Sequence, residues 1–406
     1  MSFARTLFIA LSAFAWAASA FGQAASMHHD AHARDECAGI ALNCASAVTP
    51  FFDNARGRLW IAWSAGGAVS VAHSDDDGKS FSPPIVIGQH GAMLDVGADA
   101  RPQIVLDTQG RVTVAYDVFK DRQYNAQVMV STSADGTAFS APHSLSSEPA
   151  SQRFPMLEAT QDGAIFMAWL DKRTVAAARS KGIAQAGAAL AYAWSHDGGA
   201  SFGPEQIAAD HSCECCRLAL AFDAQQRPVV LLRSIYGKNE RDHAVVTFSA
   251  DGSAGPAYRV AADHWAIDGC PHHGPSLAVA GDGSYQAAWF TLGQARQGLF
   301  YARSADGGKT FSAPSAVGDA DQQAGRPQLL ARGNEVWLAW KEFDGKRVFI
   351  KARHSADAGL HWSADRLIGS TSAYADHPQL TAGRQHVYLS WMTRAEGYRL
   401  IPLEQP

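Results

Sequence analysis

Long apolar runs are absent from this 406-residue sequence after its first 20 residues, so we expect no membrane-spanning helix in the rest of the chain. Basic runs are absent too: only 18% of the residues are charged, and the formal net charge is −5. This composition argues against a nucleic acid or a membrane surface as the partner. Cysteine is scarce, with six residues in all, yet three of them crowd into HSCECC at 211–216.

The first residues have the pattern of an export signal. Arg5 precedes the apolar run TLFIALSAFAWAA, which is too short to span a bilayer, and Ala18-Ser19-Ala20 offers small residues at a cleavage site. We expect a signal peptide over 1–20, with cleavage as late as Ala24 as an alternative. No cysteine follows the run where a lipoprotein anchor would need one. The sequence therefore predicts a periplasmic or secreted protein.

An apolar strand, usually ending in an aromatic residue, recurs along the chain. Its seven copies are LWIAW (59–63), VTVAY (112–116), IFMAW (165–169), VVLL (229–232), YQAAW (285–289), VWLAW (336–340) and VYLSW (387–391). A short polar turn separates each copy from a preceding strand, which often starts with proline, as in TPFF and RPQIVL. The pattern predicts two antiparallel strands in every repeat.

A second hairpin lies between most copies, and its turn follows the template S-x-D-x-G-x-x-[FW]. The turns are SDDDGKSF (74–81), SADGTAF (133–139), SHDGGASF (195–202), SADGGKTF (304–311) and SADAGLHW (355–362), with a degenerate SADGSAG at 249–255. In such a turn the Asp carboxylate accepts local backbone N–H groups and the Gly takes a positive φ. The motif is structural and does not identify a ligand.

Together, the repeats and turns resemble the Asp-box, or BNR-repeat, proteins, which include the sialidases, over nearly all of the chain after the signal. The resemblance implies an all-β fold, a β-propeller of four-stranded antiparallel blades. A period of about 40 to 60 residues also suits a propeller, because one blade cannot bury both of its faces alone. We predict a His/Cys-containing segment over 21–44 and a single propeller over 45–406. Seven blades are favoured over six, with AGIALN (38–43) expected to supply the missing outer strand.

Two loops rich in cysteine and histidine precede the first strands of the fourth and fifth repeats: HSCECCR (211–217) and DGCPHHG (268–274). Equivalent loops of adjacent blades lie close together on one rim of a propeller. Thiolates and imidazoles select soft or borderline metals, so we predict a copper site, Cu(I), with zinc as the alternative. The candidate ligands are His211, Cys213, Cys215, Cys216, His264, Cys270, His272 and His273.

The N-terminal segment contains further candidate ligands, which reach the same rim if the segment folds over the ring: Met27, His28, His29, His32, Cys37 and Cys44. Disulfides are the alternative in an exported protein, one between Cys37 and Cys44 and another between the 213–216 group and Cys270. A bond between the adjacent Cys215 and Cys216 would form a strained ring.

A sialidase-like glycoside hydrolase is the competing function. The resemblance implies an arginine cluster and a tyrosine nucleophile, for which Arg101, Arg153, Arg326 and Tyr374 are the matching candidates. The glutamate partner and the acid aspartate have no match, and salt bridges to a neighbouring blade are the expected role of such rim arginines.

We therefore favour metal handling or redox chemistry and lean against a hydrolytic enzyme. A third alternative is a disulfide-stapled propeller that binds another exported or outer-membrane protein. We expect a monomer.

Overall fold

The computed structural model describes residue 37 and residues 39–404. The chain divides into two units, Met1–Cys37 and Ala38–Pro406. The expected signal peptide and the candidates Met27, His28, His29 and His32 lie outside the described residues. No helix among the described residues is long and apolar enough to cross a membrane.

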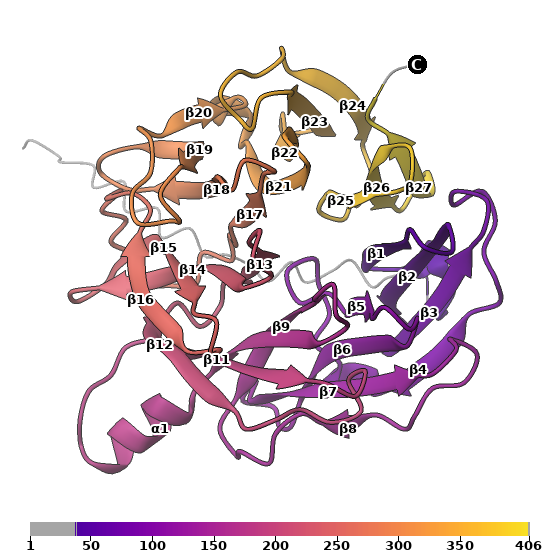
Figure 1. Ribbon diagram of the computed structural model, residues 1–406, viewed down its shortest axis with the longest axis horizontal. Helices are drawn as coiled ribbons and strands as arrows, with labels where there is room; N and C mark the ends of the chain where they lie inside the picture. The colour runs from indigo at the N-terminus through magenta and orange to yellow at the C-terminus, as the bar shows by residue number, and fades with distance from the viewer. Residues whose placement is uncertain (1–36, 38, 405–406) are drawn as a thin grey trace, which may run out of the picture. The chain divides into compact units, whose positions relative to one another are not determined.

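The second unit is built from antiparallel sheets (Figure 1). The first two have four strands each: β1 (Ala47–Asp53), β2 (Arg58–Ala65), β3 (Ala68–Ser74) and β4 (Ile85–Gln89), then β5 (Gln103–Leu106), β6 (Val112–Phe119), β7 (Ala126–Ser133) and β8 (His143–Ser144). An eight-stranded sheet follows: β9 (Gln152–Ala159), β10 (Ile165–Asp171), β11 (Ala188–Ser195), β12 (Gln206–Ser212), β13 (Ala219–Phe222), β14 (Pro228–Tyr236), β15 (Glu240–Phe248) and β16 (Ala254–Arg259).

The remaining sheets complete the unit. They are β17 (Ser276–Val279), β18 (Tyr285–Leu292), β19 (Gln297–Ser304) and β20 (Ser315–Val317); β21 (Gly325–Arg332), β22 (Glu335–Phe343), β23 (Val348–Ser355) and β24 (Arg366–Thr371); and the three-stranded β25 (Gln379–Ala382), β26 (Val387–Thr393) and β27 (Gly397–Pro402). Short helices are η1 (Leu42–Cys44), η2 (Gly91–Met93), α1 (Arg173–Ser180) and η3 (Ala320–Gln322).

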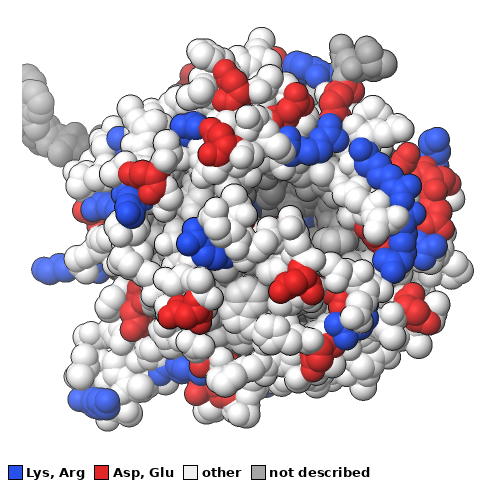
Figure 2. Space-filling view, viewed as in Figure 1, with Lys and Arg blue, Asp and Glu red and all other residues white. Residues whose placement is uncertain are grey.

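The innermost strands form a ring. β1, β5, β9, β13, β17, β21 and β25 contact one another in that order, and β25 contacts β1. In Figure 1 the sheets are arranged around a common centre, and Figure 2 shows a hollow at the middle of the same face, with Lys and Arg side chains among Asp and Glu around it. β12 and β14 are joined through the pair Ser212 and Ser234 alone, which merges two four-stranded groups into one sheet.

The predicted strand pattern is confirmed. The seven repeated apolar segments, six of them ending in an aromatic residue, form β2, β6, β10, β14, β18, β22 and β26, each the second strand of its group. Their terminal tryptophans are almost completely buried, below 2% exposed: Trp63, Trp169, Trp289, Trp340 and Trp391. Burying these aromatic side chains stabilises the ring, because each face of a group is shielded from water only by its neighbour.

The repeated turns have the predicted local bonds. At 304–310 the Gly308 N–H donates to Ser304 Oγ at 2.9 Å and the Thr310 N–H donates to Asp306 Oδ1 at 2.9 Å. Gly308 takes φ 84°. The same bonds recur at 74–80, 195–201 and 355–361, so each turn satisfies its own polar groups.

The expectation that AGIALN adds an outer strand is wrong for the described residues 39–43. Leu42–Cys44 forms a 3₁₀ helix that contacts β27. The carbonyl of Ile40 accepts the Trp63 indole N–H at 2.9 Å, and that of Asn43 accepts from Arg394 at 3.1 Å. These acceptors are therefore used by side chains rather than by a strand ladder.

Candidate metal centre

The first cysteine loop lies between β12 and β13. The Cys213 N–H donates to the carbonyl of Arg233 at 2.7 Å, which holds the start of the loop against β14. Cys213, Cys215 and Cys216 are 1%, 3% and 1% exposed and pack together as a cluster of their own. The loop thus places three sulfur atoms in a site from which water is excluded.

All three thiols are free, and their sulfur atoms face one another. Cys213 Sγ lies 3.6 Å from Cys215 Sγ and 3.7 Å from Cys216 Sγ. A disulfide requires about 2.0 Å. Sulfur ligands about 2.3 Å from a tetrahedral metal ion are roughly 3.8 Å apart, close to the spacing of this cluster.

The second loop adds Cys270 and His272, which form a group with Cys215. The three ligand atoms of this group lie within 4.8 Å of one another, as do those of Cys213, Cys215 and Cys216. Arg326 donates to the carbonyl of His272, and Arg233 donates to the carbonyl of His273 at 2.9 Å. Two guanidinium groups therefore hold this loop beside the first one.

The sulfur atoms differ in electrostatic environment. Hydrogen bonds from Cys215 and Cys216 lower the pKa of Cys213, and Arg241, whose Nη1 donates to Cys213 Sγ at 3.1 Å, lowers it further. Hydrogen bonds with Cys213, Cys216 and Cys270 raise the pKa of Cys215, and burial raises that of Cys216. Of the three sulfur atoms, that of Cys213 therefore has the surroundings that most favour a thiolate.

Arg233 is a site residue that the sequence analysis missed. It ends the fourth copy of the repeated strand, at the position that is Trp or Tyr in the other six copies. Its side chain is 1% exposed, lies over the Trp265 ring at 4.6 Å and donates to three carbonyl groups, those of Arg241, His273 and Phe290. The break in the aromatic pattern was a visible signal, whereas no local signal marks Arg241.

Three predicted histidine ligands lie outside the two groups of possible metal ligands. His211 Nδ1 is 3.1 Å from the carbonyl of Ala186, and His264 Nδ1 is 3.0 Å from Glu240 Oε2. His273 stacks on Phe290, with ring centroids 4.1 Å apart. Of the predicted ligands among the described residues, the structure brings together Cys213, Cys215, Cys216, Cys270 and His272.

Cys37 and Cys44 are disulfide-bonded. This is the alternative that the sequence left open for them, and a disulfide sulfur is not a thiolate ligand.

The arginine rim, here Arg101, Arg153, Arg217 and Arg326, is paired with carboxylates. Arg101 and Asp376 are both buried and 2.8 Å apart. Arg326 lies 2.7 Å and Arg217 3.5 Å from Asp99, while Arg153 pairs with Asp95.

Tyr374 donates its hydroxyl proton to the carbonyl of Ser46 at 3.0 Å. A cavity of about 130 Å³ beside Arg101 and Arg217 is lined by Gln103, Gln328 and Gln379 from three first strands.

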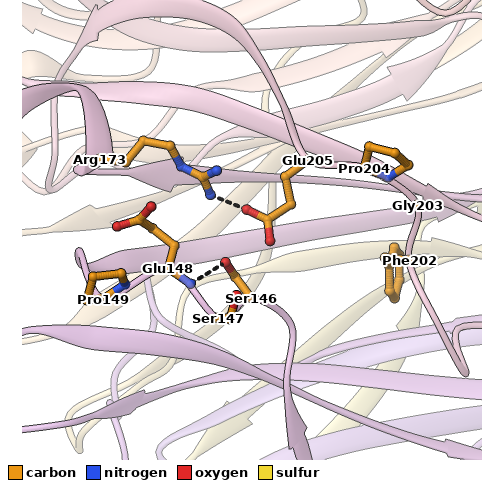
Figure 3. Close-up of a pocket in the computed structure, with 9 residues that line it drawn as sticks. All are labelled: Ser146, Ser147, Glu148, Pro149, Arg173, Phe202, Gly203, Pro204 and Glu205. Carbon is orange, nitrogen blue, oxygen red and sulfur yellow. Dashed lines mark hydrogen bonds and ion pairs between the residues drawn. The ribbon is translucent and has the colours of Figure 1, made fainter. Parts of the chain in front are cut away.

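A larger, open hollow of about 720 Å³ has no cysteine among its lining residues (Figure 3). Residues after β8, the start of α1 and the segment before β12 line it. Arg173 points across it toward Glu205, with which it forms an ion pair, and also pairs with Asp171 at 2.7 Å. Because Glu205 and Asp171 already neutralise its guanidinium, the hollow offers no unpaired cation to a ligand.

No family model matches the chain, and no curated protein matches it. Several solved structures are similar to the chain. A protein of unknown function from Dyadobacter fermentans DSM 18053 is 19% identical, with a TM-score of 0.50 over 74% of this chain and 92% of its own. A polysaccharide lyase of family PL25, an ulvan lyase, is 11% identical, with a TM-score of 0.59 over 87% and 91%. The Hadza microbial sialidase Hz136 is 13% identical, with a TM-score of 0.52 over 85% and 76%. At these identities the likeness shows a sialidase-like β-propeller fold and no more.

Proposed function

We propose that this protein binds Cu(I) through the cysteine loop 213–216 and the adjacent Cys270 and His272. The observation that carries the proposal is the cluster of three free, buried sulfur atoms 3.6 and 3.7 Å apart. Thiolates favour Cu(I) and Zn(II) over hard cations. Three sulfurs suffice for Cu(I), which accepts a low coordination number, whereas structural zinc takes four ligands.

The contrast among the six cysteines supports a ligand role. Cys37 and Cys44 are disulfide-bonded, whereas the other four are free although three of them touch. In an exported protein, thiols so close together would be expected to oxidise unless they had another function. We propose that the protein is exported, because residues 1–20 have the pattern of a signal peptide. We propose further that metal binding keeps these thiols reduced.

We also propose that the ring has seven blades. The contacts among seven first strands support this number, with two blades merged in the eight-stranded sheet through Ser212 and Ser234. The cysteine loops then belong to the fourth and fifth blades. The turns with local Ser–Asp–Gly bonds support placing the chain with the Asp-box propellers.

The test is a titration of the reduced protein with Cu(I) against a competing chelator. The triple variant Cys213→Ser/Cys215→Ser/Cys216→Ser should lose more than about 100-fold in affinity, because even loss of an outer-shell partner costs 10- to 100-fold. The variant Cys37→Ser/Cys44→Ser, which also lacks cysteines, is the matched control and should bind copper like the wild type. Deletion of 27–33 should have little effect. Wild-type-like affinity in the triple variant, or absence of free thiols under mild reductant, would reject the proposal.

A further inference from the structure

The two groups of ligand atoms overlap at a single residue. Cys213, Cys215 and Cys216 form the buried group, and Cys215, Cys270 and His272 form a second group that reaches the surface. Cys215 belongs to both. Its sulfur atom therefore lies between a sulfur-only set and a mixed sulfur and nitrogen set.

We infer that the site holds two Cu(I) ions bridged by the Cys215 thiolate, an inner ion on the buried group and an outer ion on Cys270 and His272. This inference rests on the proposed function and assigns its stoichiometry. A thiolate sulfur has several lone pairs and can bind two soft ions at once, which an imidazole nitrogen cannot do.

The spacing of the ligands argues against one ion using all five. Ligands on opposite sides of an ion with bonds of about 2.3 Å are at most about 4.6 Å apart. The ligand atoms of each group lie within 4.8 Å of one another, near this limit, whereas the five atoms do not form one such group, and only Cys215 is common to both. An ion bound to the buried sulfurs thus leaves Cys270 and His272 as the start of a second coordination sphere.

Charge balance permits the second ion. An inner Cu(I) with three thiolates carries a net charge of −2, and Arg233 and Arg241, whose positive charges act on Cys213, compensate it. The outer ion adds one positive charge and one thiolate, that of Cys270. The net charge of the cluster is unchanged, so the second ion places no further uncompensated charge in the site.

Burial gives the two ions different access. Cys213 and Cys216 are 1% exposed, whereas Cys270 is exposed. A chelator should therefore remove the outer ion first, and the inner ion should exchange slowly.

The experiment counts copper per chain in the full-length, reduced protein by Cu(I) titration and native mass spectrometry. We expect two ions in the wild type and one in Cys270→Ser/His272→Ala. The matched control His211→Ala/His264→Ala changes two histidines outside both groups and should keep two ions. X-ray absorption on the loaded wild type should show copper–copper scattering, which tests the bridge without any variant.

The outcomes separate the two claims. Saturation of the wild type at one ion, two ions in the Cys270→Ser/His272→Ala variant, or two ions without copper–copper scattering would overturn the bridged pair and leave copper binding intact. Absence of any bound copper would overturn the proposed function as well.

Discussion

The cysteine loops and the arginine rim both lie where chain segments enter the first strands, yet their polar groups are satisfied in different ways. Each rim arginine has a carboxylate partner, as in the buried pair of Arg101 and Asp376. In the cysteine cluster, three sulfur atoms have mainly one another and Arg241 as partners. The charges of the rim arginines are thus neutralised by carboxylates of the protein itself. The cysteine cluster instead offers sulfur lone pairs to a ligand, beside the positive charge of Arg241.

This contrast separates structural polar residues from candidate functional ones. Arginines at strand entrances recur at Arg101, Arg217 and Arg326, and pairing with Asp376 or Asp99 links groups that are not neighbours in the ring. Their structural role is sufficient to explain them. The cysteines have no such partner. A single buried thiol packs as a small apolar side chain, but three thiols in contact also bring together groups that bind metal and are readily oxidised.

Breaking the Arg101 pair should have the largest effect on stability. Asp376→Asn leaves the guanidinium buried without a countercharge, and we expect a loss of about 3–5 kcal/mol in the free energy of unfolding. Denaturant unfolding measures it. Asp75→Asn, which breaks an exposed pair with Arg58, is the control and should cost less than about 1 kcal/mol. If Asp376→Asn lost as little stability as Asp75→Asn, the buried rim pair would not be structural.

Removing the charge beside the thiolate should have a smaller effect, confined to the cluster. Arg241→Gln removes the guanidinium that donates to Cys213 Sγ, and we expect about a tenfold loss of Cu(I) affinity, the low end of the range for outer-shell partners. Arg58→Gln is the matched control on the surface. Unchanged copper affinity in Arg241→Gln would mean that the guanidinium does not stabilise the bound thiolate.

The stability of the fold should also depend on pH through Asp117, a buried carboxyl on which the charge of Arg153 acts. Burial, followed by the charge of Asp95, raises the pKa of Asp117 to about 8, whereas the ordinary value is near 4. The folded state therefore holds this proton more tightly than the unfolded state, and its contribution to stability is lost as pH rises between about 4 and 8.

Asp117→Asn removes this contribution while keeping an oxygen that accepts the Phe154 N–H. The variant should gain in Tm relative to the wild type as pH increases from 5 to 8. A constant difference in Tm across this range would contradict the raised pKa.

Replacing Tyr374 should have the smallest effect, because we expect no sialoside cleavage by the wild type either. The candidate arginines are occupied by Asp376, Asp95 and Asp99, and Tyr374 donates to a backbone carbonyl. We expect negligible turnover of a sialoside reporter, equal in the wild type and Tyr374→Phe. Robust turnover that disappears in Tyr374→Phe would reverse the comparison and make the arginine rim the functional site.

Local patterns were enough to predict the strands and turns. Strand positions follow from apolar segments that are separated by polar turns. The turns themselves depend on bonds that span only a few residues, such as those among Ser304, Asp306 and Gly308. The nearness of the two cysteine loops also followed from the repeat, since equivalent loops of adjacent blades must be neighbours.

Residue patterns along the chain were therefore enough to predict the all-β repeat, its turns and the two cysteine-rich loops. Which candidates converge depends on the folded chain, which leaves His211 and His264 outside the ligand groups and places Cys215 in both of them. The tertiary structure also decided that Arg101 pairs with Asp376, 275 residues away, and that Arg233 holds the second loop. These contacts depend on side-chain directions across separate strands, and such directions arise only when the whole ring packs.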